Sequence, residues 1–379
     1  MSARPVQQVA AYVFPGFSAE PRISSWHGRD WTEWDLLQQA RPRFAGHRQP
    51  IVPAWGYFDE ADPHWAARQI DLAADHGVTC FLFDWYWYDG AQFLNASLDD
   101  GHLEAANVDR MSFALMWANH DWYDLQPVSY RGDPDKLFSG RVSEQDFESI
   151  TTLWVERYFS HPSYLLFDGA PYLSIYDLAS FIDSFGGVTN ARAALDRLSH
   201  KARQAGFPGI HLNVIAWSLN LLPGELAVTD PSTLVESLGV ASMGSYTWWH
   251  DYGPTSFPTC PYDEAADSAY QIWEKHRSAF SVPHHPNISM GWDSSPRTVQ
   301  SDRYEPRPGY GFLPVCEGNT PAAFRTACER ALAFVADAPE VQMVTVNAWN
   351  EWTEGSYLLP DTVHGNAYLE AIRDVFGAA

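Results

Sequence analysis

Basic side chains are scarce in this sequence. Lysine and arginine number 24 against 47 aspartates and glutamates, so the formal net charge at pH 7 is −23. A protein with this charge repels the phosphates of nucleic acids and the anionic surface of a membrane. We therefore expect no nucleic-acid partner. No run approaches the roughly 18 consecutive apolar residues that would predict a transmembrane helix.

Cysteines are few as well, and none has the spacing of a metal ligand. They stand alone along the chain, which is typical of buried thiols rather than of a disulfide framework or a zinc site. No DxDxDG calcium loop occurs, so the sequence predicts neither a required metal nor a cofactor, although its acidity leaves an oxygen-ligand calcium site open. The four cysteines are Cys80, Cys260, Cys316 and Cys328.

Two further absences concern the start of the chain and its glycine-rich turns. The opening segment MSARPVQQVAAYVFPGF lacks the long apolar stretch and the small-residue cleavage site of a secretory signal, so we expect a cytoplasmic protein. Neither GxGxxG nor GxxxxGKS/T follows any strand-like segment, so nothing supports dinucleotide-binding or P-loop chemistry.

The sequence does contain eight apolar or aromatic runs that read as strands, most of them followed by helical periodicity. Near-continuous apolar runs are typical of strands covered on both faces, and their alternation with helices indicates parallel βα units. We predict a single (β/α)₈ barrel over residues 1–379, with an open doubly wound sheet as the alternative. The predicted strands are residues 9–14, 78–85, 111–117, 171–176, 210–217, 241–248, 287–293 and 343–349.

Several of the predicted helices have clear start and stop signals. Asp62 before Pro63 predicts a capped helix that Gly77 ends, and Ser143 with Asp146 forms a capping-box pattern. Further helices are predicted at 190–205, 263–280 and 321–336. The long irregular segments all follow strands, so we expect them at the active-site face of the barrel. They are residues 15–60, 86–110, 118–142 and 294–320.

Polar and aromatic residues gather directly after five of the predicted strands, in FDWYWYDG, WANHDW, TWWHDY, GWDSSPR and NAWNEWTEG. The C-terminal ends of barrel strands share one rim, so these segments predict one site. An aromatic ring can lie against the apolar face of a sugar, although aromatics also simply fill cores. The aromatic candidates for substrate contact are Tyr86, Trp87, Trp117, Trp122, Trp248, Trp292 and Trp352.

Two glutamates after the last predicted strand are the candidate catalytic pair. Cleavage of a glycosidic bond needs a group that protonates the leaving oxygen and a second carboxylate that acts as nucleophile or base. Glu351 and Glu354 meet this need, and indole rings beside them would raise a carboxyl pKa by desolvation. The same spacing also occurs on exposed helix faces, so the pair alone does not decide between a catalytic site and a surface helix.

Other polar residues near the strand ends are candidates for hydrogen bonds to sugar hydroxyls. For Arg297 the alternative is an ion pair with Asp293 that only stabilises its loop. For His120 the alternative is a hydrogen-bonded place on the rim. The candidates are Glu33, Asp84, Asn119, His120, Asp121, Asp293, Arg297 and Asn350.

Six segments, in order along nearly the whole chain, match motifs of a known family. WHGRDWTEW at 26–34 is similar to WxGxGFTEW, FAGHRQP at 44–50 to FxGHYQP, and FDWYWYDG at 83–90 to YYHYWFNG. WANHDW at 117–122 is similar to WANENW, GWDSSPR at 291–297 to GWDNTPR, and NAWNEWTEG with the later GNAYLEAI to NAWNEWAEG and GYGYLEAV. By these segments the chain resembles the glycoside hydrolase family 99-like proteins, including the WbsX-type proteins encoded with polysaccharide biosynthesis genes.

The resemblance implies a barrel and retaining cleavage of α-mannosides within a chain. In the mechanism proposed for family 99, one carboxylate deprotonates the sugar 2-hydroxyl, whose oxygen attacks the anomeric carbon to give a 1,2-anhydro sugar. The second carboxylate protonates the leaving glycoside and then activates water. Carried onto this chain, the resemblance makes Glu351 the base and Glu354 the general acid/base. Trp85 and His120 replace a histidine and a glutamate of the family pattern at positions expected to face substrate, which puts the identity of the sugar in doubt.

We therefore predict a glycoside hydrolase that acts on an α-linked, mannoside-like oligosaccharide or polysaccharide. A glycosyltransferase or transglycosylase of surface polysaccharide synthesis is one alternative, although the sequence has neither a DxD metal motif nor a Rossmann-type turn. A barrel that binds sugar without catalysis is the other.

Overall fold

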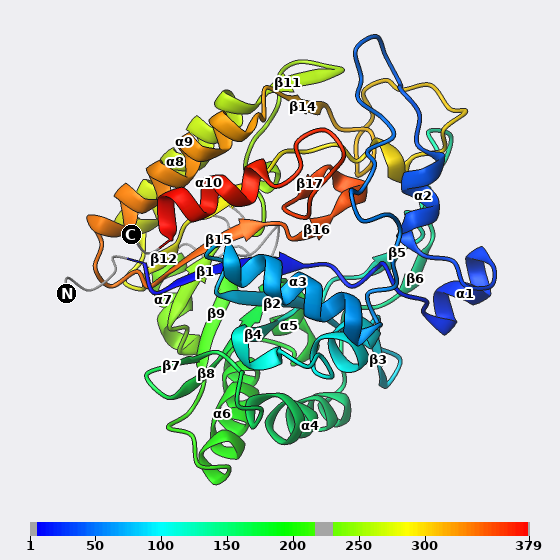
Figure 1. The fold of residues 1–379 in the computed structure, drawn as a ribbon. Helices are drawn as coiled ribbons and strands as arrows, with labels where there is room; N and C mark the ends of the chain where they lie inside the picture. The colour runs from blue at the N-terminus through cyan, green and yellow to red at the C-terminus, as the bar shows by residue number, and fades with distance from the viewer. Residues whose placement is uncertain (1–5, 217–229, 378–379) are drawn as a thin grey trace.

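The computed structural model describes residues 6–216 and 230–377, and in them a parallel β-barrel is surrounded by helices (Figure 1). Its strands pair in sequence order, and the last returns to the first with Gln8 opposite Met343. The prediction of a (β/α)₈ barrel is confirmed. The strands are β1 (Gln8–Val13), β2 (Cys80–Tyr88), β4 (Ser112–Trp117), β8 (Ala170–Ile175), β9 (His211–Ile215), β10 (Ser242–Gly244), β12 (His284–His285), β13 (Asn287–Ser289) and β15 (Met343–Asn347).

Two short strands share the seventh position of the barrel. β12 pairs with β10, and β13 pairs with β15. Pro286 separates the two strands, because proline lacks the N–H that a continuous ladder needs. The Pro286 carbonyl still accepts a hydrogen bond of 3.0 Å from the Thr345 N–H. The predicted strand at 287–293 begins at Asn287 as expected but already ends at Ser289, and the separate strand β12 precedes it. Residue 217 of the predicted strand 210–217 lies outside the described residues.

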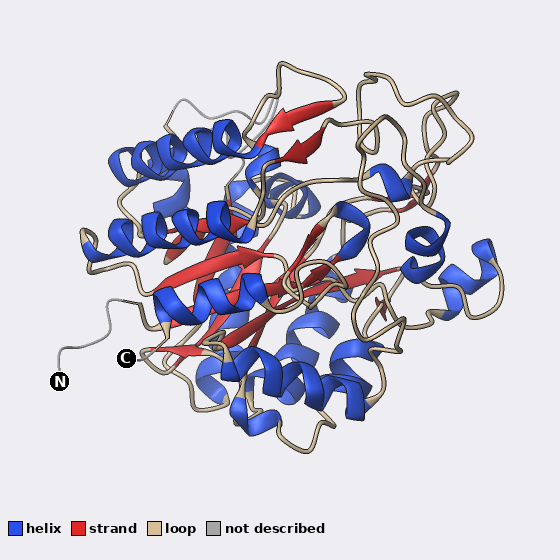
Figure 2. Cartoon of the chain, turned by 45° about the horizontal axis from the view of Figure 1, so that its top comes forward, coloured by secondary structure: helices blue, strands red, loops and turns tan. Residues whose placement is uncertain are grey.

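The helices cover the outside of the barrel (Figures 1 and 2). Their local signals act as predicted: Asp62 accepts from the His64 N–H at the start of α3, and Ser143 with Asp146 forms a complete capping box. The helices are α1 (Pro21–His27), α2 (Glu33–Gln39), α3 (Pro63–Asp75), α4 (Glu144–Leu153), α5 (Leu178–Ser184), α6 (Val188–Gln204), α7 (Pro231–Leu238), α8 (Tyr262–Ala279), α9 (Pro321–Ala336) and α10 (Ala367–Phe376).

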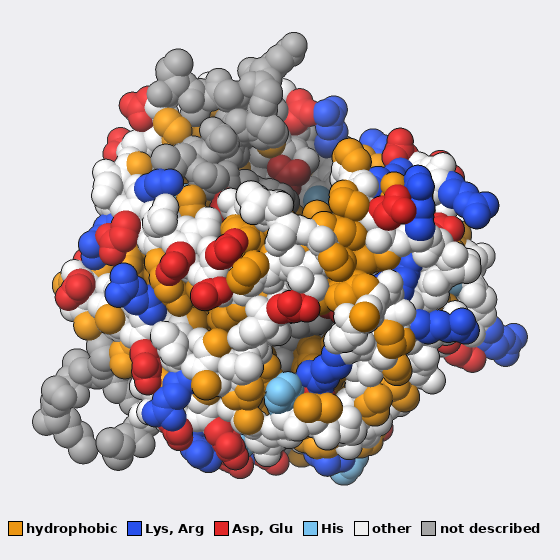
Figure 3. All heavy atoms as spheres, turned by 90° about the horizontal axis from the view of Figure 1, so that it is seen from above, with side chains coloured by type: hydrophobic (Ala, Val, Ile, Leu, Met, Phe, Trp, Pro, Cys, Tyr) orange, Lys and Arg blue, Asp and Glu red, His pale blue; other side chains and the backbone are white. Residues whose placement is uncertain are grey.

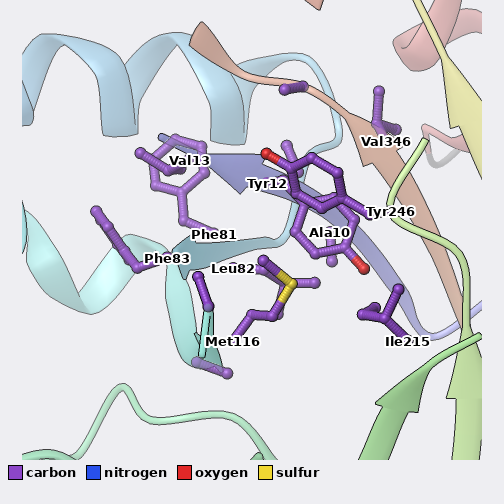
Figure 4. Close-up of a cluster of buried hydrophobic side chains, with 14 of the residues drawn as sticks. Ala10, Tyr12, Val13, Phe81, Leu82, Phe83, Met116, Ile215, Tyr246 and Val346 are labelled. Carbon is purple, nitrogen blue, oxygen red and sulfur yellow. The ribbon is translucent and has the colours of Figure 1, made fainter. Parts of the chain in front are cut away.

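The barrel interior is filled by large side chains rather than left as a pore. The rings of Tyr12 and Tyr246 lie side by side there, with centroids 4.7 Å apart, and Leu82 lies close to them (Figure 4). Phe81 and Phe83 point away from this cluster, since successive side chains of a strand face opposite sides. This packed layer closes the lower part of the barrel, so any substrate space must lie above it, at the C-terminal ends of the strands.

The loops after the strands gather at that end, where Figure 1 shows α1, α2 and small hairpins. The loops after β4 and β13 are joined directly, because the Val128 N–H donates to the Arg297 carbonyl at 2.8 Å and the Val299 N–H to the Val128 carbonyl at 3.0 Å. The short strands here are β3 (Ala91–Phe93), β5 (Trp122–Tyr123), β6 (Lys136–Phe138), β11 (Thr259–Pro261), β14 (Val315–Glu317), β16 (Asn350–Glu351) and β17 (Ser356–Tyr357), while β7 (Leu166–Phe167) precedes β8.

Many charged side chains lie on the surface, and the cysteines lie in the interior. Acidic and basic side chains are interspersed over the face shown in Figure 3. The four cysteines are buried free thiols, as the sequence predicts. Within residues 6–216 and 230–377, no helix has the length and apolar character needed to cross a bilayer.

Candidate active site

A cavity of about 680 Å³ opens at the C-terminal end of the barrel. Phe14 and Met116, at the ends of β1 and β4, are among the residues that line it, and most of the others come from the loops after the strands. Many of the predicted site residues line it: Asp84, Tyr86, His120, Asp121, Trp122, Trp292, Arg297, Glu351 and Glu354. Several other lining residues are not among the predicted ones: Tyr176, Tyr246, Trp249, His250 and Tyr310.

The two candidate catalytic glutamates are placed by a tight turn after β15. Glu351 ends β16, Glu354 ends a single 3₁₀ turn, and Gly355 follows with a φ of 65° before β17 begins. A Cβ at Gly355 would lie 2.8 Å from the Asp293 Cβ, so only glycine allows this close approach of the two loops. Both glutamates are buried at the cavity wall, which removes the exposed-helix interpretation of their spacing.

One guanidinium group contacts both of them. Arg297 Nη1 donates to Glu354 Oε1 at 2.8 Å, and Nη2 donates to Glu351 Oε2 at 3.2 Å. Its Nε donates to Glu33 Oε2 at 3.1 Å, so a single buried cation meets three buried carboxylates. These contacts fix the two candidate catalytic groups on one side of the cavity.

Arg297 does not pair with Asp293, which was the alternative drawn from the sequence. Asp293 Oδ2 instead lies 2.8 Å from His47 Nε2 and accepts from Gln49 Nε2 at 2.7 Å. Burial alone would raise the pKa of Asp293, but these hydrogen bonds and the one from the Ser295 N–H bring it below the ordinary value. Asp293 faces a second, smaller cavity of about 230 Å³, so it anchors loops beside the main site.

Two tyrosines complete the hydrogen bonds of the glutamates. The Tyr310 hydroxyl accepts from Arg297 Nη1 at 2.6 Å and donates to Glu354 Oε1 at 2.6 Å. The Tyr246 hydroxyl lies 3.2 Å from Glu351 Oε1 and 2.9 Å from Asp84 Oδ2. Glu351 therefore has a polar contact at each oxygen, whereas both donors of Glu354 meet the same oxygen.

Burial changes the acidity of this pair. Desolvation raises the pKa of Glu351 well above its usual range, the neighbouring Glu354 raises it further, and Arg297 opposes both effects. Desolvation also raises the pKa of Glu354, against the opposing effects of Arg297 and the Tyr310 hydrogen bond. Two carboxyl groups that share one buried site lose their protons in separate steps, which allows one to act as an acid while the other is ionised.

A row of polar residues behind the cavity positions these groups. The Phe14 N–H donates to Asn350 Oδ1 at 2.8 Å and Asn350 Nδ2 donates to the Phe14 carbonyl at 2.7 Å, which ties the Glu351 segment to the end of β1. Glu33 begins α2 and accepts from Gln126 Nε2 at 2.8 Å. Asn350 and Glu33 thus act on the site without lining the cavity.

His120 and Asp121 lie at the rim. The His120 ring lies 2.8 Å through Nδ1 from the Asp121 carbonyl, and because only an N–H can bond to a carbonyl, neutral His120 presents Nε2 as an acceptor. Burial lowers the pKa of His120, which keeps the ring neutral. Asp121 binds Lys136 Nζ at 3.1 Å, and Trp292 stacks on Trp249 at 5.9 Å to form an aromatic wall.

Several predicted contact residues lie in the core instead. Trp87 stacks on Trp85 at 6.0 Å on the outer side of β2, so neither faces the cavity, in contrast to the expectation for Trp85. Trp117 packs at 5.5 Å from Trp154, also outside the barrel. The cause is the alternation along each strand, which directs neighbouring side chains to opposite faces.

The remaining three are fixed by hydrogen bonds or stacking. Trp248 Nε1 donates to the Asn287 carbonyl at 2.7 Å, and Trp352 stacks on Tyr357 at 4.1 Å. Asn119 Nδ2 donates to the Asp177 carbonyl at 2.7 Å. None of them lines the cavity, so we propose no substrate contact for these side chains.

The acidic groups of the site do not form a cation site. In residues 6–216 and 230–377, no group of three or more histidine, cysteine, aspartate or glutamate side chains is arranged to bind a metal ion. What the side chains of the cavity themselves offer is proton transfer and hydrogen bonding.

Comparisons with known proteins place this geometry in a family. A family model described as "Glycosyltransferase WbsX" matches residues 9–372. The chain belongs to the WbsX family. It is also similar to the uncharacterized protein WxcX of two Xanthomonas campestris pv. campestris strains, at 27% identity over 98% of this chain and 50% of each relative. The chain thus spans about half the length of the curated relatives it matches.

Solved structures share the fold. The chain is similar to a GH99 endo-α-mannosidase from Bacteroides thetaiotaomicron (TM-score 0.59, 13% identity, 97% of this chain and 95% of that one). It is also similar to a glycoside hydrolase-like protein (TM-score 0.60, 16% identity, 99% of this chain and 95% of that one). A third similar structure is a β-glucosidase from Thermotoga maritima (TM-score 0.52, 8% identity, 98% of this chain and 98% of that one). At these identities the likeness shows the fold, and the resemblance read from the sequence motifs is confirmed.

One buried acid behind the site makes a prediction about stability. Both oxygens of Glu60 accept from Asn350 Nδ2, at 2.9 and 3.0 Å, and burial raises the Glu60 pKa from 4.5 to about 8. The folded chain keeps this proton over a pH range in which the unfolded chain releases it. The stabilising effect is therefore complete below pH 4.5 and is lost as the pH rises through 8.

Denaturant unfolding of the wild type and of Glu60→Gln at several pH values checks this. Glutamine keeps an acceptor for Asn350 but cannot ionise, so we expect the free energy of unfolding of the wild type to fall relative to the variant by up to about 1.4 kcal/mol per pH unit. Exposed Glu340→Gln is the matched control. Parallel curves for the wild type and Glu60→Gln would show that Glu60 is ionised in the folded chain at neutral pH.

Proposed function

We propose that this protein is a glycoside hydrolase that cleaves an α-linked, mannoside-like glycan with retention. The observation that carries the proposal is the convergence of Glu351 and Glu354 on one guanidinium group, in a cavity with aromatic walls at the C-terminal end of the barrel. Membership of the WbsX family and the fold of glycoside hydrolases support it.

The hydrogen bonds support separate roles for the two glutamates. Glu351 Oε2 accepts from the Arg297 guanidinium, and this cation opposes the rise that burial causes in the Glu351 pKa, which favours the anion that a base needs. Glu354 receives both of its donors at Oε1, so Oε2 remains to carry a proton toward the leaving oxygen. This is the division of work that a general acid and a general base require.

The reaction then proceeds in two balanced steps. Glu351 takes the proton of the sugar 2-hydroxyl, O2 attacks the anomeric carbon to form a 1,2-anhydro sugar, and Glu354 protonates the departing glycosidic oxygen. Glu354 next takes a proton from water as the water oxygen attacks the anomeric carbon, and Glu351 returns its proton to O2. Two inversions at that carbon give net retention, and both glutamates recover their starting states.

The charges of the cavity support a neutral or cationic glycan. Its wall contains the acidic side chains of Asp84, Asp121, Asp177, Glu351 and Glu354. Arg297 already contacts three carboxylates, and burial keeps His120 and His250 neutral by lowering their pKa values, to about 3 for His250. A uronic acid or the pyrophosphate of a nucleotide sugar would meet uncompensated negative charge.

The description of the WbsX family favours a second candidate, transfer of the glycosyl group to another sugar. The same first step serves both functions, because a sugar hydroxyl can replace water in opening the 1,2-anhydro intermediate. A sugar donor with a simple glycosidic leaving group fits the acidic cavity better than a nucleotide sugar does.

A substrate panel tests these proposals. We expect neutral aryl α-mannosides and bacterial α-glycans to be cleaved with an α-configured first product by NMR, with kcat/KM roughly ten-fold or more above the matching uronides. The 2-deoxy analogue should not be cleaved, because it lacks the attacking oxygen. Efficient cleavage of the 2-deoxy analogue or preference for uronides would contradict the proposal, and binding without turnover on any substrate would favour a sugar-binding barrel.

A further inference from the structure

Asp84 is a third acidic group of the cavity that the two-glutamate mechanism does not use. It lies on β2 with its side chain toward the barrel interior, and it is 5% exposed. Its Oδ2 is 2.9 Å from the Tyr246 hydroxyl. Its Oδ1 is buried and has no hydrogen-bond partner among the described residues. An ionised carboxylate with only one donor in such a place is costly.

The Tyr246 hydroxyl shows how this cost is avoided. It lies within hydrogen-bonding distance of Asp84 and of Glu351, yet it has a single hydrogen to donate. One of the two carboxyl groups must therefore supply its own proton to this chain of contacts. Glu351 touches the Arg297 guanidinium at 3.2 Å and Asp84 has no such contact, so the negative charge is better placed on Glu351.

We propose that Asp84 is a positioning residue that stays protonated: its carboxyl group donates to the Tyr246 hydroxyl oxygen, and Tyr246 donates its hydrogen to Glu351 Oε1. The inference rests on the proposed function, because it takes Glu351 to be the carboxylate that works as an anion. Asp84 acts on the reaction through Tyr246, by keeping the hydroxyl hydrogen directed at the base.

The groups around Asp84 are consistent with this protonation state. The other acidic and basic groups that face it are Glu351, Glu354 and Arg297, so three acidic side chains share one cation. The other titratable neighbours are Tyr12, Tyr86, Tyr176 and Tyr246, which are neutral because burial raises their pKa values. Burial likewise raises the pKa of Asp84 well above its usual range, while Tyr246 and Arg297 oppose the shift and Glu354 adds to it.

Infrared spectroscopy tests the protonation without any substrate. In the difference spectrum of the wild type minus Asp84→Asn at pH 7, we expect the carbonyl band of a protonated carboxylic acid, and we expect that band to shift in the Tyr246→Phe background. Asp293→Asn is the matched control, since Asp293 is buried but its pKa is lowered, and its difference spectrum should contain carboxylate bands only. Carboxylate bands alone for Asp84→Asn would overturn the proposal.

The acidic limb of the kcat/KM profile tests the action on Glu351. The amide that Asp84→Asn introduces carries no charge. If Asp84 is already neutral, this substitution therefore leaves the pKa of the base in place, within about 0.3 pH units. If Asp84 were an anion, its removal would move this limb about one unit or more to lower pH and overturn the proposal. Tyr246→Phe removes a donor from ionised Glu351 and should move the limb to higher pH.

Two further results separate a positioning role from a merely structural one. Asp84→Asn should keep at least ten-fold more activity than Asp84→Ala, because the amide still donates to Tyr246. In the Tyr246→Phe background that difference should vanish, and a difference that persisted would contradict action through Tyr246. If no glycan were turned over while the Asp84 acid band was present and shifted in Tyr246→Phe, the proposed function would fail and the hydrogen-bond chain would stand.

Discussion

Replacing Glu354 by glutamine should lower kcat/KM for an unactivated α-glycan by about 10³-fold, because glutamine cannot protonate the leaving oxygen. The same variant should lose less than about ten-fold on an α-glycosyl fluoride, whose leaving group needs little proton transfer. Glu351→Gln should lose about 10³-fold on both substrates, since the 2-hydroxyl then has no base. Steady-state kinetics with each variant measures how the loss of kcat/KM differs between the two substrates.

The controls separate chemistry from folding. Glu340→Gln changes an exposed glutamate just before β15, at the opposite end of the barrel, and should match the wild type on both substrates. Thermal unfolding of the two site variants should show that they fold, since glutamine has nearly the same shape and keeps one oxygen as an acceptor for the Arg297 guanidinium. Full activity in both variants would remove the glutamates from the mechanism, and equal losses on the fluoride would remove the assignment of separate roles.

The positions of the site segments follow from the sequence because the signals of barrel strands are local. Eight apolar runs separated by helical periodicity predict the barrel, and the segments after them necessarily meet at one rim. The signals at Asp62 and Ser143 are equally local: each side chain accepts from a backbone N–H within three residues of it. Predictions that depend on neighbours in sequence agree with the structure for this reason.

Which side chain of a segment faces the cavity depends on a step of one residue. In FDWYWYDG the side chains of Asp84 and Tyr86 reach the cavity, whereas Trp85 and Trp87 pack on the outside of β2. A strand sends successive side chains to opposite faces, so choosing by chemical type picked residues from both. The same alternation holds in the predicted strand at 241–248. Ser242 faces inward and binds Asn213, and Tyr246, four residues later, lies on the same face.

The partners of Arg297 had no local signal at all. Its contacts with Glu33 and Glu351 join residues 264 and 54 positions apart, and its neighbour Tyr310 lies in an irregular loop without periodicity. Arg297 lies close to Asp293 in the sequence, and short spacing favours a pair between them, but the three-dimensional junction of several loops decides the pairing. Such long-range contacts can be recognised only once the fold brings them together.

Replacing Arg297 by methionine should be the most destabilising single change in the site. Arg297 is 6% exposed and contacts Glu33, Glu351 and Glu354, so its removal leaves buried carboxylates without their cation. Breaking a buried ion pair from one side costs about 3–5 kcal/mol. We expect a loss of this size in the free energy of unfolding at pH 7, measured by denaturant titration, together with loss of turnover.

The pH dependence of that loss identifies its cause. Without Arg297 the folded-state pKa values of Glu351 and Glu354 rise further above their unfolded values, so stability is present below the unfolded pKa and is lost as the pH rises. The deficit of Arg297→Met should therefore be largest near pH 8 and shrink below about pH 5, where the unfolded carboxyl groups are protonated as well. Arg325→Met, which breaks exposed ion pairs on α9, should leave the free energy of unfolding nearly unchanged and show no such trend. A deficit that was the same at every pH would mean that Arg297 contributes by packing against Phe14 and Tyr310 rather than by compensating the carboxylates that we assign to catalysis.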